Sequence, residues 1–319
     1  MQQGAPAIEI RQLRKVFHPK GSPPVTALDG VSLTVGRGEI FGFLGRNGAG
    51  KTTAVKVLTN MIADYEGECR IQGLPTGSLD VRRVVGLLPE VTDFHAWLTA
   101  EEILWFHGRL HGLSKAVLSE RVPALLGRLG IERDAWTRRV GPFSQGMLQR
   151  LGIAVALVGD PEIVFLDEPT ANLDPLGRRD VRNLLLELER EGRTVFLNSH
   201  LLSDVEMTCH RVAILEQGRI VASGDVSELA QLRPYAHIRA TGVPGALLDE
   251  LRTLSDDVAV LDGTIVVRIR TEDDLDPIPS MVERHGARLR YLAVARESLE
   301  DVFMRMVGSP GAQSGGGTQ

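Results

Sequence analysis

The sequence predicts an α/β protein with two domains of unequal size, and three observations lead to this prediction. Up to about residue 228, short apolar runs alternate with stretches of helical periodicity, which is the pattern of a parallel sheet with crossover helices. One apolar run leads through a glycine-rich segment into a helix, the order in which a phosphate-binding loop is built. Beyond residue 228 a shorter pattern of strands and helices begins, and the 319 residues of the chain are enough for both domains.

Composition narrows the class of protein. Apolar residues make up 43% of the chain and charged residues 24%, proportions typical of a globular protein. The formal net charge is −5, so no net field favours nucleic acid, and phosphate binding must depend on local geometry. Cys69 and Cys209 lie far apart without a CxxC spacing, which argues against a disulfide framework or a zinc site and fits a reducing cytosolic setting.

Nothing in the sequence predicts a membrane-spanning segment. The longest apolar stretch, residues 153–159, is much shorter than the about 20 residues that cross a bilayer. The first residues lack the basic and apolar regions of a signal peptide. We therefore expect a chain that does not cross a membrane by itself.

Three strands are expected before the glycine-rich segment. Alternation of apolar and polar residues over 8–17 predicts an edge strand. A turn-rich stretch at 19–24 separates it from a second strand at 31–35. Residues 40–44 form an apolar run bounded by glycines, and this run predicts a buried strand.

The glycine-rich segment matches the pattern GxxxxGK[ST], and helical periodicity continues after it from residue 53 to residue 61. Its residues are Gly45, Arg46, Asn47, Gly48, Ala49, Gly50, Lys51 and Thr52. The glycines let backbone N–H groups surround an anion, and the helix N-terminus adds a partial positive charge. We expect Lys51 to reach the β- and γ-phosphates of a nucleotide and the Thr52 hydroxyl to bind Mg²⁺. The alternative, a glycine turn with an unrelated lysine, does not explain the full pattern.

An all-α insertion is predicted from about residue 92 to residue 158. Short strands and turns precede it at 64–83, and a buried strand at 84–88. Thr99 and Glu102 form a capping box that begins a helix. The last helix, at 148–158, follows a segment that begins at Ser144.

Two carboxylates, Asp167 and Glu168, end the next apolar strand, and His200 ends the strand after it. Because parallel strands end at one edge of a sheet, these three side chains and Lys51 are expected to lie together there. We assign Asp167 to Mg²⁺, Glu168 to the water that attacks the γ-phosphorus, and His200 to hydrogen bonding with the γ-phosphate. The alternatives are that the carboxylates only cap a turn and that His200 makes only local hydrogen bonds.

Over residues 7–228 these motifs resemble the nucleotide-binding subunit of an ATP-binding cassette (ABC) transporter. A GTPase would need an NKxD segment, and the chain has none. The resemblance implies a P-loop NTPase (RecA-like) core with an antiparallel β subdomain and a helical insertion. It also implies an ATPase with ATP and Mg²⁺ as its cofactors. The residues that carry it are Gly45 to Thr52, Ser144 to Leu151, Ile163 to Glu168, Asn172 to Asp174 and His200.

The resemblance adds further nucleotide contacts. Ser144 and Gly146 match the signature loop, which in the family binds the γ-phosphate of ATP held by the opposite subunit, and the neighbouring Gln145 is included with them. Asp174 matches the loop that crosses this interface. Thr53 is assigned to the nucleotide together with the phosphate-binding loop. Phe17 stands where the family has an aromatic ring that stacks on adenine, with a core residue of its strand as an equal alternative.

The implied partners are a second cassette and a membrane protein. Two cassettes face to face with two ATP molecules between them make a homodimer, or a heterodimer with a similar chain. The permease is expected to be a separate chain of the ABC-2 type, which places this chain at the cytoplasmic face of the plasma membrane; no nucleic acid partner is expected. Candidates for the permease contact are Phe94, Trp97, Leu98 and Trp105, with a core position favoured for Trp105.

Two departures from the family pattern are visible. The signature reads Phe143-Ser-Gln-Gly-Met instead of LSGGQ, and Glu90 stands where most cassettes have a glutamine that binds Mg²⁺. Glu90 is kept as a metal ligand, since a carboxylate also binds Mg²⁺. Both features resemble the exporter subgroup with a separate ABC-2 permease. Two alternatives stay open: a cassette ATPase that acts on ribosomes or DNA, and a catalytically weak regulatory cassette.

Residues 229–307 are predicted to form an α+β accessory domain. Residues 236–295 follow a βαββαβ pattern, and a helix is expected at 298–307. This domain is similar to the C-terminal extension of drug- and antibiotic-resistance exporters. Residues 272–276 are expected to be a solvated acidic loop, and residues 308–319 a disordered tail.

Overall fold

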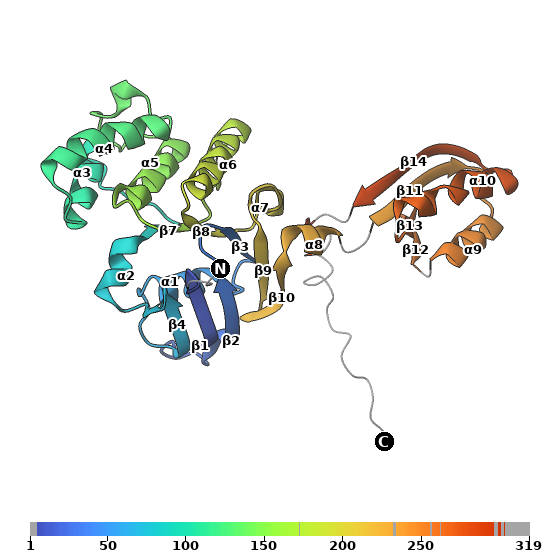
Figure 1. The fold of residues 1–319 in the computed structure, drawn as a ribbon, viewed down its shortest axis with the longest axis horizontal. Helices are drawn as coiled ribbons and strands as arrows, with labels where there is room; N and C mark the ends of the chain where they lie inside the picture. Colours follow the sequence, from blue (N-terminus) through green and yellow to red (C-terminus); the bar gives the residue numbers. More distant parts are fainter. Residues whose placement is uncertain are drawn as a thin grey trace, which may run out of the picture. The chain divides into compact units, whose positions relative to one another are not determined.

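The computed structural model describes residues 5–171, 173–231, 234–255, 257–261, 263–296, 299–300 and 303. The chain divides into two compact units, Met1–Gly224 and Asp225–Gln319, which we call the cassette unit and the C-terminal unit (Figure 1). Among the described residues, no helix is both long and apolar enough to cross a membrane.

The centre of the cassette unit is a six-stranded sheet in the order β10-β9-β3-β8-β7-β6. The strands that position the site are β3 (Ile40–Gly45), β8 (Thr194–Ser199), β7 (Ile163–Asp167) and β6 (Val85–Leu88), and all of them run parallel. β9 (Arg211–Glu216) also pairs parallel to β3, and β10 (Arg219–Asp225) completes the sheet. The predicted parallel α/β core is therefore confirmed.

Four phenylalanines hold this sheet against its neighbour. Phe196 packs its ring against Phe41, Phe43 and Phe165, with ring centroids 5.4–5.8 Å apart. All four side chains are completely buried and belong to one core cluster with residues of the second sheet of the unit. Because rings of this size bury a large apolar area, they fix the strands whose ends form the site.

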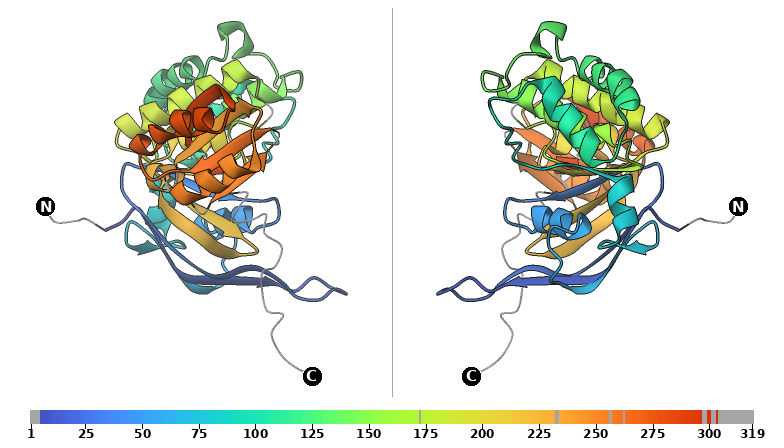
Figure 2. Two further views of the ribbon diagram at one scale, coloured as in Figure 1. Left: turned by 90° about the vertical axis from the view of Figure 1, so that its right-hand side faces the viewer. Right: turned by 90° about the vertical axis from the view of Figure 1, so that its left-hand side faces the viewer.

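The second sheet is antiparallel, in the order β2-β1-β4-β5. Its strands are β1 (Ile8–Phe17), β2 (Val25–Val35), β4 (Glu66–Ile71) and β5 (Leu74–Pro75). The hairpin of β1 and β2 projects from the unit (blue in Figure 2). The prediction that residues 8–17 form an edge strand was wrong, because β1 pairs with β2 on one side and β4 on the other.

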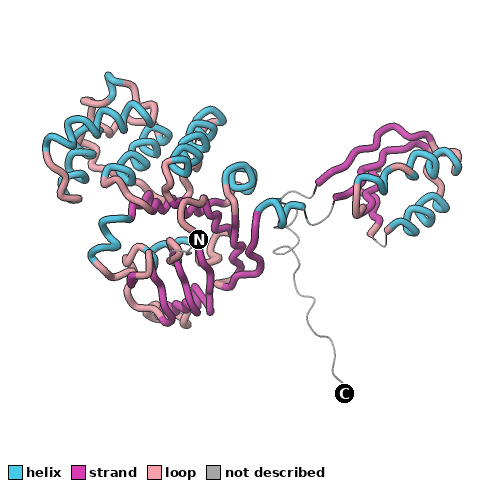
Figure 3. The backbone as a smooth tube through the Cα atoms, viewed as in Figure 1, coloured by secondary structure: helices cyan, strands magenta, loops and turns pink. Residues whose placement is uncertain are grey.

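The helices of this unit follow the predicted order with two corrections (Figure 3). The segment at 64–83, predicted as short strands and turns, also contains the helix α2 (Leu79–Val84), which is capped by Ser78 Oγ accepting from Asp80 N. Because this helix extends to Val84, the strand predicted from residue 84 begins at Val85. α5 begins at residue 145 instead of 148, because Ser144 caps it. The other helices of the unit are α1 (Lys51–Leu58), α3 (Ala100–Leu110), α4 (Lys115–Arg128), α5 (Gln145–Val158), α6 (Pro175–Arg190) and α7 (Leu202–Thr208), whereas α8 (Val226–Gln231) belongs to the C-terminal unit.

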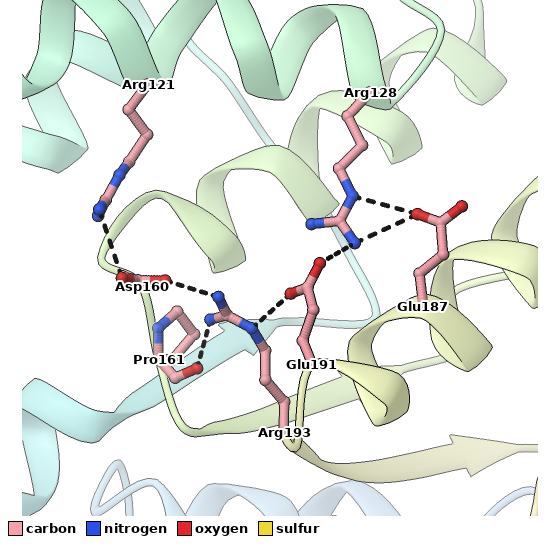
Figure 4. A network of polar contacts seen from close by, with 7 residues as sticks. All are labelled: Arg121, Arg128, Asp160, Pro161, Glu187, Glu191 and Arg193. Atoms are coloured by element: carbon pink, nitrogen blue, oxygen red, sulfur yellow. Dashed lines mark hydrogen bonds and ion pairs between the residues drawn. The ribbon is translucent and has the colours of Figure 1, made fainter.

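Charged side chains tie the helical insertion to the parallel core (Figure 4). Arg128 on α4 contacts Glu187 of α6 at 3.2 Å and Glu191, which follows the end of α6, at 2.7 Å. Arg193, just before β8, contacts Glu191 at 2.9 Å and Asp160 at 2.6 Å. Arg193 also donates to the carbonyl of Pro161 at 2.7 Å, and Arg121 of α4 contacts Asp160 at 3.4 Å. This ionic network spans three segments that are distant in sequence.

The C-terminal unit has the predicted βαββαβ order over its described residues. Its sheet runs β12-β13-β11-β14, and one core cluster joins the sheet to α9 and α10. Residues 272–275 form the short 3-10 helix η2, with a capping box from Thr271, so the predicted acidic segment is not an irregular loop, although Asp273 and Asp276 are exposed as expected. The predicted tail at 308–319 and most of the predicted helix at 298–307 lie outside the described residues. The elements are β11 (Pro234–Thr241), α9 (Gly245–Leu254), β12 (Val258–Leu261), β13 (Thr264–Arg268), α10 (Pro277–Arg284) and β14 (Arg288–Arg296).

Candidate nucleotide-binding site

A cleft of about 380 Å³ lies where β3 and β7 end. It brings together the phosphate loop, Glu90 and the two carboxylates at the end of β7, as the order of motifs predicts. The start of β2 also lines it, which the sequence did not indicate. The lining residues are Val25, Thr26, Ala27, Asn47, Gly48, Gly50, Lys51, Thr52, Thr53, Glu90, Asp167, Glu168 and Asn198.

Two glycines of the loop are required by close backbone contacts. A Cβ on Gly45 would lie 2.4 Å from the carbonyl oxygen of Leu215, and one on Gly50 would lie 2.3 Å from that of Ala27. Gly50 also has a φ of +111°, which disfavours any side chain. Any larger residue at either position would push the loop away from its neighbours. Gly45, Arg46 and Ala49 support the loop without lining the cleft.

Lys51 begins α1 and is 7% exposed. Its Nζ donates to the carbonyl oxygens of Gly45 at 2.8 Å and Arg46 at 3.3 Å. Burial lowers the pKa of Lys51, and the nearby charges of Glu168, Asp167 and Glu90 oppose that shift. The ammonium group is therefore held inside the loop, at the mouth of a site with three carboxylates.

Asp167 is 2% exposed, and burial followed by the charge of Glu90 raises its pKa to about 6. Hydrogen bonds from Thr52 and Asn198 act in the opposite direction, the latter through Nδ2 to Asp167 Oδ1. The Thr52 hydroxyl also lies 3.5 Å from Glu90 Oε2, so either carboxylate can accept its one proton. These groups therefore form a cluster of oxygen atoms, and the three carboxylates carry more negative charge than the single Lys51 ammonium neutralises.

This donor set fits Mg²⁺, which binds oxygen and in nucleotide sites uses one or two carboxylates together with phosphates. Among the described residues, no group of three or more His, Cys, Asp or Glu side chains forms a metal site by itself. The residues that would hold the ion are Thr52, Asp167 and Glu90.

Glu168 has contacts that orient both its side chain and its backbone. Oε2 lies 2.7 Å from Nδ1 of His200, which does not itself line the cleft. The backbone N–H donates to the carbonyl oxygen of Asn198 at 2.8 Å, and the residue has a φ of +54°. A left-handed backbone at a residue other than glycine costs about 1–3 kcal/mol and persists only where its surroundings hold it, which is common in active sites.

The signature residues lie in a different cleft of about 580 Å³, larger than the one beside Lys51. Ser144, Gln145, Gly146 and Asp174 all line it. Ser144 Oγ caps α5 by accepting from Met147 N at 3.2 Å, and Asp174 caps α6 by accepting from Gly177 N at 2.7 Å. Within one chain, these residues are thus not brought together with the phosphate loop.

Phe17, at the end of β1, is 38% exposed and does not line the cleft. Lys15 Nζ lies 5.2 Å from the centroid of its ring. The alternative of a core residue was therefore wrong, because a large part of the ring is open to solvent.

Sequence reasoning missed two buried amides at this site. Asn198, 1% exposed, contacts Asp167 and lines the cleft. Gln149, 7% exposed, donates from Nε2 to the carbonyl oxygen of Glu168 at 3.1 Å. Asn198 could have been found from the sequence, because a polar amide within an otherwise apolar strand is buried and requires hydrogen-bond partners.

The chain is similar in sequence to known transport proteins. The ABC transporter family model matches residues 28–171. An uncharacterised ABC transporter ATP-binding protein of Synechocystis sp. is 40% identical over 285 residues, covering 89% of this chain and 79% of that protein. The Nod factor export ATP-binding protein I of Paraburkholderia xenovorans is 35% identical (95% and 97% covered). A bacitracin transport ATP-binding protein of Bacillus licheniformis is 32% identical (88% and 92% covered).

Solved structures agree with the fold. The ATP-binding subunit of an ABC transporter superposes with a TM-score of 0.63 at 30% identity, covering 77% of this chain and 98% of that one. A dimeric ATP-binding cassette bound to ADP and Pi superposes with the same TM-score at 24% identity, covering 68% and 98%.

Proposed function

The chain belongs to the family of ABC transporter ATP-binding subunits, and we propose that it powers an export complex. The family hydrolyses ATP and pairs as dimers with a transmembrane permease. In our proposal two copies close around two MgATP and drive a separate permease of the ABC-2 type.

One observation carries this proposal: among the described residues of one chain, the phosphate loop and the signature residues line two separate clefts. Lys51, Asp167 and Glu168 line the first cleft, whereas Ser144 and Asp174 line the second. A second chain, facing the first, would supply its signature cleft to the nucleotide. This arrangement supports a homodimer or a heterodimer with a similar chain.

Each half has a proposed chemical role. The amides of the loop from Gly45 to Gly50 and the ammonium of Lys51 bind the phosphates. Glu168 is the general base that takes a proton from the attacking water, and His200, 2.7 Å from it, orients that carboxylate and the γ-phosphate. Bound Mg²⁺, held by Thr52, Asp167 and Glu90, would neutralise charge that develops on the phosphates.

The adenine base and the signature loop complete the site. The ring of Phe17, which is 38% exposed, would stack on the adenine base. Thr53 would add a polar group beside the phosphates. Gln145 would add one at the start of the signature helix.

The names of two relatives support a role in export. One relative is named for Nod factor export and another for bacitracin transport, and by analogy this chain acts at the cytoplasmic face of the plasma membrane. Exposed apolar groups beside the Glu90 loop support a permease contact: Trp97 is 65% exposed and stacks on His95. Phe94 and Leu98 are half-buried, as is Trp105, for which a core position was favoured.

The experiment is an ATPase assay on the purified chain with a matched pair of lysine variants. Lys51→Ala should lower hydrolysis by about 10²–10³-fold, because it removes a charge aimed at the phosphates. Lys56→Ala changes an exposed lysine of the same helix and should have no effect. Equal activity of the two variants, or activity that persists without Mg²⁺, would contradict the proposal.

A further inference from the structure

Gln149 connects three parts of the ATP site through one buried amide. It lies on α5, the helix that the signature residue Ser144 caps. Its Nε2 donates to the carbonyl oxygen of Glu168 at 3.1 Å, and its Oε1 accepts from Thr92 Oγ1 at 3.4 Å. Thr92 belongs to the loop that carries Glu90. The signature helix, the Glu90 loop and the exit of β7 therefore meet at this side chain.

The Glu168 peptide is held from both sides. On the amino side, Asn198 accepts its N–H at 2.8 Å as part of the parallel pairing of β7 and β8. On the carbonyl side, Ala171 N–H donates at 3.1 Å, and Gln149 adds a side chain from another element. Because the φ of Glu168 is +54°, its backbone is strained and depends on these contacts. A shift of Gln149 would therefore change where the Glu168 carboxylate points.

The helix and the loop that Gln149 joins are packed without spare room. A Cβ built on Gly152 of α5 would lie 2.6 Å from Leu88 Cδ1 and 2.6 Å from Thr92 Cγ2. Because the Leu88 and Thr92 side chains occupy the space that a Cβ would take, they pack directly on the backbone of α5, and the loop cannot move toward α5 unless the helix also moves. Displacement of the Glu90 loop is thus passed to α5, and through Gln149 to Glu168.

We propose that Gln149 is a positioning residue for Glu168, and that it makes the orientation of this carboxylate depend on α5 and the Glu90 loop. The inference rests on the proposed function, which makes Glu168 the general base. ATP binding does not involve Gln149, since this residue does not line the nucleotide cleft. Its loss should consequently slow hydrolysis and leave binding unchanged.

The test substitutes the amide without changing the size of the side chain. In the full chain, Gln149→Met should lower kcat roughly 10- to 100-fold, because a small misplacement of a catalytic group is costly. KM for ATP and the affinity for a fluorescent ATP analogue with Mg²⁺ should stay at their wild-type values, and the melting temperature should fall by only a few degrees. Thr92→Val removes only the hydroxyl that orients the amide, so it should lower kcat less, in the same direction.

Two controls separate this role from a structural one. Gln72→Met makes the same exchange at a half-buried glutamine outside the nucleotide cleft, whose amide donates to Glu162, and it should leave kcat unchanged. Gln149→His keeps an N–H donor and should recover part of the lost rate. A wild-type kcat in Gln149→Met would overturn the inference, and so would an equal loss of kcat, affinity and melting temperature. A wild-type chain that binds ATP without hydrolysing it would instead refute the proposed function.

Discussion

The two units of this chain differ most in what they bury. In the cassette unit, buried polar side chains gather at the strand ends, among them Lys51, Gln149, Asp167, Glu168 and Asn198. Among the described residues of the C-terminal unit, every fully buried side chain is apolar. The backbone shows the same contrast: described non-glycine residues with positive φ occur only in the cassette unit, whereas in the C-terminal unit positive φ is confined to glycines.

This contrast shows where the chain gives up stability for chemistry. Buried charge and left-handed backbone cost free energy, and at Asp167 and Glu168, which line the nucleotide cleft, we attribute their retention to the proposed activity. The described residues of the C-terminal unit show neither buried polar side chains nor left-handed backbone outside glycine, and they contain no comparable site. We therefore expect substitutions in the two units to separate activity from stability.

The largest effect on stability is expected from the C-terminal core. Leu251 is completely buried there, and Leu251→Ala should cost about 2–5 kcal/mol. For a domain of this size that lowers the melting temperature of its own transition by more than about 8 °C. ATP hydrolysis should stay at the wild-type rate.

The matched variant is Leu188→Ala on α6, where the leucine is equally buried in the cassette unit. It should destabilise the cassette transition and lower hydrolysis together. Calorimetry with an ATPase assay measures both. Loss of activity in Leu251→Ala at a temperature where the cassette stays folded would break the comparison.

A smaller effect, opposite in sign, is expected at Asp167. Its pKa in the folded chain, about 6, is above the ordinary value of 3.8, so the stability that its protonated form contributes is present below about pH 4 and lost as pH rises through 6. Asp167→Asn carries no charge and avoids this loss. In the absence of nucleotide, the variant should be roughly 2–3 kcal/mol more stable than wild type at pH 7 and similar at pH 4.

Urea unfolding across this pH range measures the difference, and hydrolysis by the same variant should fall. Stability curves that run parallel from pH 4 to pH 8 would show that Asp167 is not strained by its surroundings. That result would contradict the claim that burying the Asp167 carboxylate lowers the stability of the cassette unit.

The smallest effect is expected in the ionic network between α4 and the core. Arg193→Ala removes contacts with Asp160, Glu191 and the Pro161 carbonyl, and should cost about 1–2 kcal/mol. The control Arg252→Ala removes one exposed pair with Asp249 and should cost less than about 0.5 kcal/mol. Equal values in chemical unfolding would mean that the network adds nothing beyond isolated pairs.

Local patterns predicted the parts of the site that depend on spacing along the chain. The glycine-rich loop and the strand ends at Asp167 and Glu168 meet because sheet order follows from alternating strands and helices. The capping box of Thr99 and Glu102 is present, because it is a contact between near neighbours. Long-range contacts could not be predicted: Gln149 and Asn198 find their partners only after the sheet and α5 assemble.

The errors in the fold have similar causes. Alternation over residues 8–17 shows which face is buried and not how many neighbours a strand has, so an edge position was assigned to β1. α2 is too short to show a helical period, and its start depends on the cap at Ser78 and the burial of Val81.

The central claim, that two chains share each ATP site, is tested most directly by the mass of the Glu168→Gln variant in solution. This variant should bind MgATP without hydrolysing it, so the closed pair should accumulate at twice the mass of one chain by light scattering. The same protein with ADP, or with an added Lys51→Ala substitution, should stay monomeric. A Glu168→Gln chain that remains monomeric in saturating MgATP would contradict the shared site.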